Sequence, residues 1–262
     1  SGLFMWVSFA LAAAALSPAA GAACGGGPRL LVFGDRAGYR RRGGKREGAM
    51  RVRTMAILAA FGAVLAGPGT AQGDRAGDFD YYVMALSWSP SWCDIEGETE
   101  GQCAPERDAG WLLHGLWPQH ETGWPSHCPT TQPDPSRRMT RAVADIMGSA
   151  GLAWYQWQKH GRCAGLPAGE YFALSREAYG AVTRPDVFRR LGEDVRLPAS
   201  VVEEAWLEAN PELKADMLTV TCRDGYVQEV RICLTKGLVP RHCGADVVRD
   251  CTLERARLPA IP

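Results

Sequence analysis

Eight cysteines within residues 72–262 constrain the fold of this chain more than any other feature of its sequence. An even number of cysteines downstream of a secretion signal is typical of a disulfide framework formed in an oxidising compartment. Zinc binding is the alternative, but the sequence has no C-x-x-C pair and the spacings match no common zinc pattern. Spacing alone leaves the pairing open. The eight residues are Cys93, Cys103, Cys128, Cys163, Cys222, Cys233, Cys243 and Cys251.

The first 71 residues are predicted to lie outside the folded domain. Residues 50–71 join Arg51 and Arg53 to a short apolar run and end in small residues, as a signal peptide does. The apolar run is shorter than the about 20 residues of a membrane-spanning helix. Residues 1–49 are expected to be a leader or non-native upstream segment, with a functional basic arm as the alternative. We expect a secreted or periplasmic protein without stable membrane association.

The charge of the remaining chain argues against a broad surface for nucleic acids. The first 72 residues contain nine of the 29 basic and two of the 29 acidic side chains, so the remainder has a net charge of −7. A contact with nucleic acid must therefore be a local site. The about 190 residues from 72 to 262 fit one domain, which we expect to be monomeric.

Hydrophobic periodicity predicts an α+β domain. Apolar runs predict strands at 80–88 and 111–117, the second a central strand that Pro118 ends, with loops at 89–103 and 121–135. A hairpin is expected around residues 223–225. Helices are expected at 135–150, 152–163, 169–191 with an interruption at Pro185, and 198–211.

Two segments contain side chains suited to acid–base chemistry. They are "WLLHGLWPQH" (111–120) and "WYQWQKHGRC" (154–163). On a helix, Gln156 and His160 share one face, and Tyr155 and Lys159 share the adjacent one. Two histidines on separate elements can exchange protons with a substrate, and a lysine can lower the pKa of its neighbour and stabilise a phosphorane.

The same residues could instead have purely structural roles. His114 could be a hydrogen-bonded core residue, and the tryptophans could be core residues too. Lys159, His160 and Gly161 could end a helix, with the glycine in the left-handed conformation. Residue types and spacing leave these alternatives open.

Both segments resemble signatures of the ribonuclease T2 family. The first contains that family's His-Gly-Leu-Trp-Pro, and the second is similar to the segment that ends Trp-x-Lys-His-Gly-x-Cys. The two histidines lie 46 residues apart, in the family's order. "FDYYVMALSWSPSWC" (79–93) and "VQEVRICL" (227–234) resemble its N-terminal strand with the first cysteine and its C-terminal strand. The likeness covers about residues 79–251.

The resemblance implies a fold, an activity and a disulfide pattern. The fold would be a central antiparallel sheet packed with helices. The activity would be cleavage of single-stranded RNA through a 2′,3′-cyclic phosphate, without metal or other cofactor and often best at acid pH. DNA lacks the 2′-hydroxyl and would not be cut. The implied disulfides are Cys93–Cys103, Cys128–Cys163, Cys222–Cys251 and Cys233–Cys243.

The resemblance also assigns roles by motif position. His160 would be the general base, His114 the general acid, and Lys159 the group that stabilises the phosphorane. Trp117 would pack against the base upstream of the cut, and Tyr155 would donate a neutral hydrogen bond to substrate.

The chain departs from the family at several positions. Tyr155 and Gln156 stand where His and Glu are common. Gln156 can hydrogen-bond a phosphate oxygen, but it lacks the charge that would raise the pKa of His160. We expect an altered rate and pH optimum without loss of activity. Ser87 and Gln119 replace a frequent glutamine and a frequent acid, which leaves base preference open.

Two other functions fit parts of the sequence. One is a catalytically weak or inactive member of the fold that binds or regulates. The other is a metal-dependent phosphodiesterase, whose irregularly spaced ligands would be His114, His120 and His127. His120, His127 and His242 otherwise receive no role.

Overall fold

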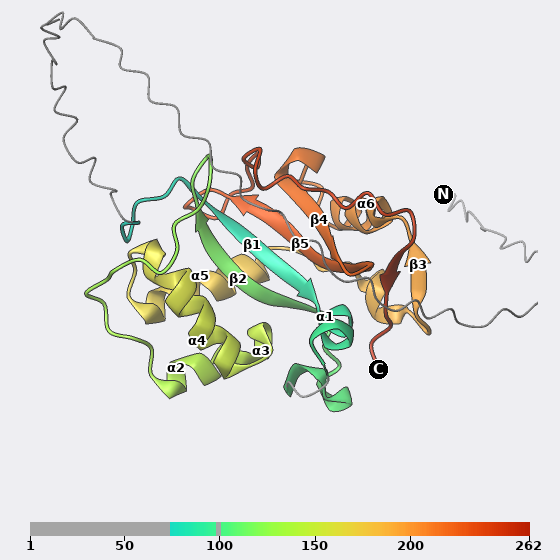
Figure 1. Ribbon diagram of the computed structural model, residues 1–262, viewed down its shortest axis with the longest axis horizontal. Coiled ribbons are helices and arrows are strands. Elements are labelled where there is room, and N and C mark those ends of the chain that lie inside the picture. The colour runs from blue at the N-terminus through green and yellow to red at the C-terminus, as the bar shows by residue number, and fades with distance from the viewer. Residues whose placement is uncertain (1–73, 98–100) are drawn as a thin grey trace, which may run out of the picture. The chain divides into compact units, whose positions relative to one another are not determined.

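The computed structural model describes residues 74–97 and 101–262, which form one sheet packed with helices (Figure 1). The predicted leader and signal peptide lie outside the described residues. None of the helices in these two ranges is long and apolar enough to span a bilayer. The strands are β1 Tyr81–Trp88, β2 Trp111–Gln119, β3 Val195–Leu197, β4 Leu218–Arg223, β5 Tyr226–Leu234 and β6 Ala256–Leu258. The helices are α1 Ser89–Glu96, α2 Arg137–Arg141, α3 Ala144–Met147, α4 Ala150–Lys159, α5 Ala168–Gly180 and α6 Ala199–Ala209.

The strands form one sheet in the order β2-β1-β5-β6-β3, and β4 also pairs with β5. All pairs are antiparallel except β5 and β6, which meet in parallel at a single pair, Tyr226 and Arg257. The α+β prediction is confirmed. The predicted antiparallel sheet is mixed at this one point.

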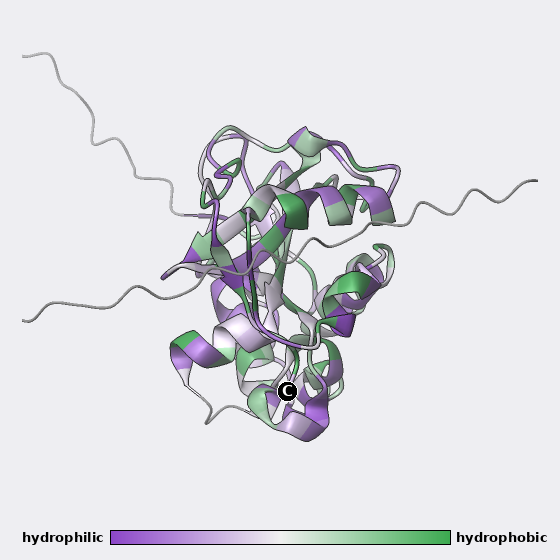
Figure 2. Ribbon diagram, turned by 90° about the vertical axis from the view of Figure 1, so that its right-hand side faces the viewer, coloured by the Kyte–Doolittle hydropathy of each residue, from purple (hydrophilic) through white to green (hydrophobic). Residues whose placement is uncertain are grey.

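The two faces of the sheet have different surroundings. On one face, Met84 and Leu86 of β1 join the main hydrophobic core with the helices. In Figure 2 the helices carry hydrophobic and hydrophilic residues along the same ribbon, as expected of elements half buried in a core. On the other face, Tyr81 and Val83 form a small cluster with Val247. This second face is less covered and carries the polar residues described below.

The prediction that Pro118 ends a central strand is wrong. β2 continues through Pro118 to Gln119, and it is an edge strand that pairs with β1. Proline cannot donate to a ladder hydrogen bond, so an edge is where a strand tolerates it. The residues of β2 are nonetheless mostly buried, which is why the strand looked central from its sequence.

Several predicted elements have different bounds. The helix expected at 135–150 divides into α2 and α3, because Val143 leaves helical geometry (φ −115°, ψ 3°). The expected loop 89–103 begins with α1, whose first turn contains Pro90, where the missing N–H is harmless. The helix expected at 169–191 ends at Gly180, and a 3₁₀ turn follows Pro185. The three-residue strands β3 and β6 are too short to give a periodic signal.

Four disulfides cross-link the described part of the domain, over sequence separations of 10 to 35 residues. They pair Cys93 with Cys103, Cys128 with Cys163, Cys222 with Cys251, and Cys233 with Cys243. These are the same pairs that the family resemblance implies. The last two attach the C-terminal segment to the hairpin of β4 and β5.

Gly161 has a packing role that differs from the helix-ending role considered above. Its φ angle is not positive, so the left-handed explanation is wrong. A Cβ atom at this position would lie 2.6 Å from Trp157 Cε3 and 2.9 Å from Tyr171 Cε1. Glycine is therefore required by the close approach of two buried rings.

We predict that Gly161→Ala lowers the free energy of unfolding by about 1–3 kcal/mol, because the added methyl overfills this contact. Urea denaturation would measure the change. The matched control is Gly180→Ala at the exposed end of α5, where a Cβ meets nothing within 4 Å. This control should be neutral or stabilising by up to about 1 kcal/mol. Equal effects of the two variants would contradict the packing role.

Candidate active site

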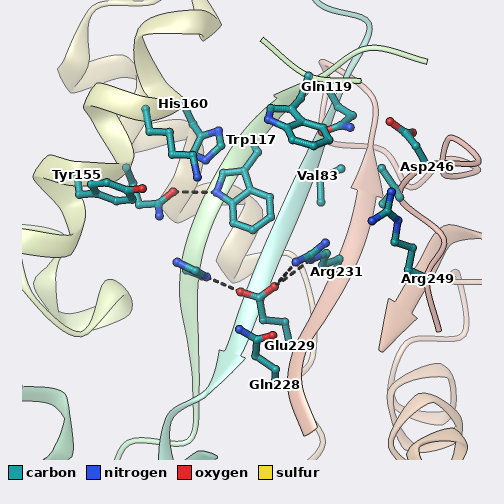
Figure 3. Close-up of a pocket in the computed structure, with 15 residues that line it drawn as sticks. Val83, Trp117, Gln119, Tyr155, His160, Gln228, Glu229, Arg231, Asp246 and Arg249 are labelled. Carbon is teal, nitrogen blue, oxygen red and sulfur yellow. Dashed lines mark hydrogen bonds and ion pairs between the residues drawn. The ribbon is translucent and has the colours of Figure 1, made fainter. Parts of the chain in front are cut away.

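A cleft of about 390 Å³ lies between the C-terminal half of α4 and the less covered face of β2, β1 and β5 (Figure 3). It brings together all six residues predicted for catalysis or substrate binding. Its lining also includes charged residues of β5 that the sequence analysis did not select. The residues from β2 and α4 are His114, Trp117, Tyr155, Gln156, Lys159 and His160, and those from β5 are Glu229 and Arg231.

A β-bulge puts His114 on the cleft face of β2. In the pairing of β1 with β2, Ala85 faces Gly115 and Leu86 faces Leu113, so His114 is the extra residue. In a regular strand, positions 114 and 117 would point to opposite faces because side chains alternate. The bulge shifts the alternation by one residue. As a result His114 and Trp117 share the cleft, with ring centroids 5.4 Å apart.

Gly115 leaves room for the Trp117 indole to reach Gln156. Trp117 Nε1 donates a hydrogen bond of 2.8 Å to Oε1 of the buried Gln156. A Cβ atom on residue 115 would overlap both of these atoms. The glycine of "HGLW" is thus required by this contact. Gln156, predicted to bind a phosphate oxygen, has its carbonyl oxygen engaged in orienting Trp117.

His160 occupies the buried side of the cleft at the end of α4. Ser149 caps the first turn of this helix by accepting a hydrogen bond from Leu152 N, and the helix ends at Lys159. The imidazole of His160 stacks on Trp117 with ring centroids 5.1 Å apart. Its Nδ1 has no hydrogen-bond partner among the described residues.

The surroundings of His160 favour its neutral form. Burial lowers the pKa of His160 to about 3, with smaller contributions from the charges of Lys159, His114 and His127. The predicted effect of Lys159 is present, but loss of hydration is the larger cause. A neutral imidazole at mildly acid and neutral pH can accept a proton.

Glu229 holds His114 from the other side of the cleft. The Glu229 carboxylate is buried, hydrogen-bonds to Nδ1 of His114, and accepts two bonds from Arg231 at 2.9 and 2.8 Å. Burial raises the pKa of Glu229. The hydrogen bond from His114 and the charges of His114 and Arg231 outweigh it and bring the pKa to about 2.

The ionised state of Glu229 fixes the tautomer of His114. A carboxylate only accepts hydrogen bonds, so Nδ1 of His114 must be the protonated donor. Nε2, on the opposite side of the ring, is then the nitrogen that can exchange a proton with a substrate. Both His114 and His160 therefore contact the ring of Trp117. His114 is bound to a carboxylate, whereas His160 is buried without an anion.

The sequence contains a local signal for Glu229 and Arg231. Opposite charges two residues apart on a strand share one face, and they stand out among the apolar residues of "VQEVRICL". The register was not readable from the sequence. It places Glu229 opposite Ser87 and Arg231 opposite Ala85 on β1, next to the bulge at His114.

The remaining predicted residues lie as follows. Tyr155 is exposed at the rim, with Lys159 Nζ 5.8 Å from its ring centroid. Gln119 lines the cleft, and the Ser87 hydroxyl donates a 3.5 Å hydrogen bond to Glu229. The structure does not bring His120 or His127 into the cleft with His114. His242 pairs with Asp216 in an exposed position.

Comparison of the sequence with known proteins identifies a family and several relatives. The Ribonuclease T2 family model matches residues 79–243. A ribonuclease of Aeromonas hydrophila is 43% identical over 103 residues, which are 39% of this chain and 46% of that protein. A probable ribonuclease of Haemophilus influenzae is 31% identical over 163 residues, 56% of this chain and 57% of that protein. The chain thus spans about half the length of these curated relatives.

A solved structure supports the fold. The RNase-related protein from Calystegia sepium aligns with a TM-score of 0.56 at 20% identity. The alignment covers 70% of this chain and 98% of that one. At this identity the likeness shows a shared fold.

We predict that His160 remains neutral far below the ordinary histidine pKa of 6.5, down to about pH 3. The unfolded chain then binds more protons than the folded one between these values, so stability falls as pH drops through this window. Nitrogen chemical shifts of the imidazole during an acid titration would measure the pKa. His160→Asn should reduce the loss of unfolding free energy between pH 6.5 and 3. Protonation of His160 near pH 6.5 would contradict the buried, neutral state.

Proposed function

Because the chain belongs to the ribonuclease T2 family, we propose that its cleft cleaves single-stranded RNA by metal-independent transesterification. The observation that carries this proposal is the placement of two histidines against Trp117 in opposite electrostatic surroundings. One is buried and neutral, and the other is bound to an ionised carboxylate. Acid–base catalysis needs such a pair, because one group must accept a proton while the other donates one.

The proposed reaction moves one proton at each histidine. His160 accepts the proton of the ribose 2′-hydroxyl, and the 2′-oxygen attacks the phosphorus. The bond from phosphorus to the 5′-oxygen breaks, and Nε2 of His114 donates a proton to that oxygen. The products are a 2′,3′-cyclic phosphate and a 5′-hydroxyl. Lys159 would stabilise the additional negative charge on the phosphorane.

Glu229 and Arg231 act as positioning residues in this scheme. Glu229 holds Nδ1 of His114, and Arg231 neutralises the carboxylate with two hydrogen bonds. The Arg231 guanidinium also lies over the Trp117 ring, 5.3 Å from its centroid. This arrangement supports a fixed orientation of both the acid and the tryptophan.

Substrate binding would use the aromatic and amide side chains of the cleft. Trp117 would contact the base upstream of the cut, and the exposed Tyr155 would contact the strand at the rim. Gln156 orients Trp117 and supplies no charge, which supports a rate and pH optimum that differ from those of relatives with glutamate. DNA would not be cleaved, because it lacks the attacking 2′-hydroxyl. The scheme uses no cofactor.

The disulfides and the signal-like segment support a cellular location and a domain organisation for the protein. Four disulfides favour an oxidising compartment. Together with the signal-like residues 50–71, they support a secreted or periplasmic protein. Its single ribonuclease domain would be residues 72–262, acting as a monomer.

We predict that His114→Ala and His160→Ala each reduce RNA cleavage by about 10²–10⁴-fold. Release of acid-soluble fragments from yeast RNA in EDTA, between about pH 4 and 8, would measure the rate. His242→Ala is the control, because His242 is an exposed histidine outside the cleft.

Three outcomes of this experiment would redirect the proposal. No cleavage by the unmodified protein would favour a non-catalytic binding protein of the same fold. Cleavage that EDTA abolishes would favour a metal-dependent phosphodiesterase. Near-full activity of either alanine variant would remove that histidine from the scheme.

We predict that Glu229→Gln lowers kcat for RNA by about tenfold with little change in KM, because Glu229 positions His114 and does not itself contact the substrate. The amide keeps the shape of the side chain but removes the negative charge that binds His114 Nδ1 and Arg231. Glu121→Gln is the matched control, because Glu121 is an exposed glutamate that pairs with Arg241 outside the cleft. An unchanged kcat in Glu229→Gln, or an equal loss of kcat in Glu121→Gln, would contradict the positioning role of Glu229.

A further inference from the structure

One wall of the cleft comes from a segment outside the range that the family model matches. The family model ends at Cys243. The following residues, 244–250, form a loop between two cysteines, and Asp246, Val247 and Arg249 of this loop line the cleft. This C-terminal loop faces the site from the side opposite to α4 (Figure 3).

Both ends of the C-terminal loop are fixed by disulfides. Cys243 is joined to Cys233 of β5, and Cys251 is joined to Cys222 of β4. The loop is thus anchored to the two strands of one hairpin. It cannot move away from the cleft without displacing that hairpin.

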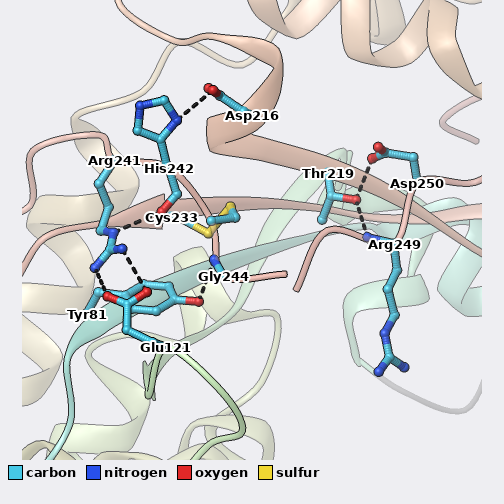
Figure 4. Close-up of a disulfide and its surroundings, with 11 residues drawn as sticks. Tyr81, Glu121, Asp216, Thr219, Cys233, Arg241, His242, Gly244, Arg249 and Asp250 are labelled. Atoms are coloured by element: carbon cyan, nitrogen blue, oxygen red, sulfur yellow. Dashed lines mark hydrogen bonds and ion pairs between the residues drawn. A yellow bond between two sulfur atoms is a disulfide. The ribbon is translucent and has the colours of Figure 1, made fainter. Parts of the chain in front are cut away.

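Hydrogen bonds from the C-terminal loop to β4 and β1 hold it further (Figure 4). The buried Thr219 hydroxyl accepts a 3.2 Å hydrogen bond from Arg249 N and donates to the Asp250 carboxylate. Gly244 N donates a 3.1 Å hydrogen bond to the Tyr81 hydroxyl. A Cβ atom on Gly244 would lie 2.8 Å from that hydroxyl oxygen, so glycine permits the contact. Val247 of the loop is buried against Tyr81 and Val83 of β1.

Arg249 is the basic side chain that this wall presents. In Figure 3 its guanidinium extends from the C-terminal loop toward β5, on the side of Arg231. Within the described ranges, the Arg249 side chain has no ion pair or hydrogen bond, whereas Arg231 is bound by Glu229. Asp246, the nearby acid of the wall, accepts a 2.6 Å hydrogen bond from Gly123 N. The cleft therefore has a cation on each wall, Lys159 from α4 and Arg249 from the loop.

Building on the proposed function, we propose that Arg249 binds a second phosphate of the RNA, adjacent to the one that is cut. An RNA strand carries one phosphate per nucleotide, and only the phosphate between His114 and His160 reacts. A guanidinium matches a phosphate with two parallel hydrogen bonds. Because residues 72–262 have a net charge of −7, an unpaired arginine in the cleft provides a local attraction for phosphate that the net charge opposes. The preferred substrate is then longer than a dinucleoside monophosphate.

The experiment compares dinucleotides that differ by one phosphate. KM is measured for ApA, pApA and ApAp, and for the matching uracil series, with the unmodified protein, Arg249→Gln and Arg190→Gln. Arg190 is an exposed arginine that does not line the cleft, so its variant is a control for loss of one positive charge.

The expected result is a lower KM for the dinucleotides that carry an added phosphate, and this difference should depend on Arg249. With the unmodified protein, an added 5′- or 3′-phosphate should lower KM about fivefold, and Arg249→Gln should abolish this difference. Arg190→Gln should keep it. On a long RNA, the slope of log KM against log salt should fall by about 0.7 in Arg249→Gln, since one phosphate contact is lost.

Two results would overturn the inference. Equal KM values for ApA and its phosphorylated forms would do so, as would a preference that survives in Arg249→Gln. Both leave the proposed function intact, because ApA itself is still cleaved. Failure of the unmodified protein to cleave any of these substrates would instead overturn the proposed function, and the inference with it.

Discussion

The antiparallel pairing of β1 with β2, broken by one bulge, is the constraint on which the site depends. The bulge at His114 lets His114 and Trp117 share the cleft while Leu113 and Leu116 remain in the core. With a regular ladder, His114 and Trp117 would point to opposite faces of the sheet. The bulge also places His114 beside Glu229, two strands away. One extra residue thus places His114 against both the Glu229 carboxylate and the Trp117 ring.

Burial affects the two histidines differently, because only His114 has a buried carboxylate beside it. His160 is buried without an anion, so burial lowers its pKa. Glu229 is buried as well, but two cationic partners keep it ionised and it in turn binds His114. A buried charge is tolerated only when it is paired and hydrogen-bonded. The cleft therefore contains a neutral histidine and a histidine held by a carboxylate, the two groups that the proposed scheme uses as base and acid.

Disulfides fix the walls around this chemistry. Cys128–Cys163 ties the loop after β2 to the turn after His160, and His127 N donates a 2.8 Å hydrogen bond to the Lys159 carbonyl. The two C-terminal disulfides fix the opposite wall. The wall formed by residues 244–250 has no helix or strand, so covalent links replace the packing that such an element would provide.

The sequence determined most of the longer helices and strands, the disulfide-rich domain and six of the residues that line the cleft, because apolar spacing and motif residues are local properties. It did not determine that β2 is an edge strand, that residues 135–150 form two helices, or that Glu229 and Arg231 meet His114. These features depend on register, on burial and on contacts between residues far apart in the chain. A one-residue change of register reverses every side chain of a strand, so only the tertiary structure could decide which polar groups face one another.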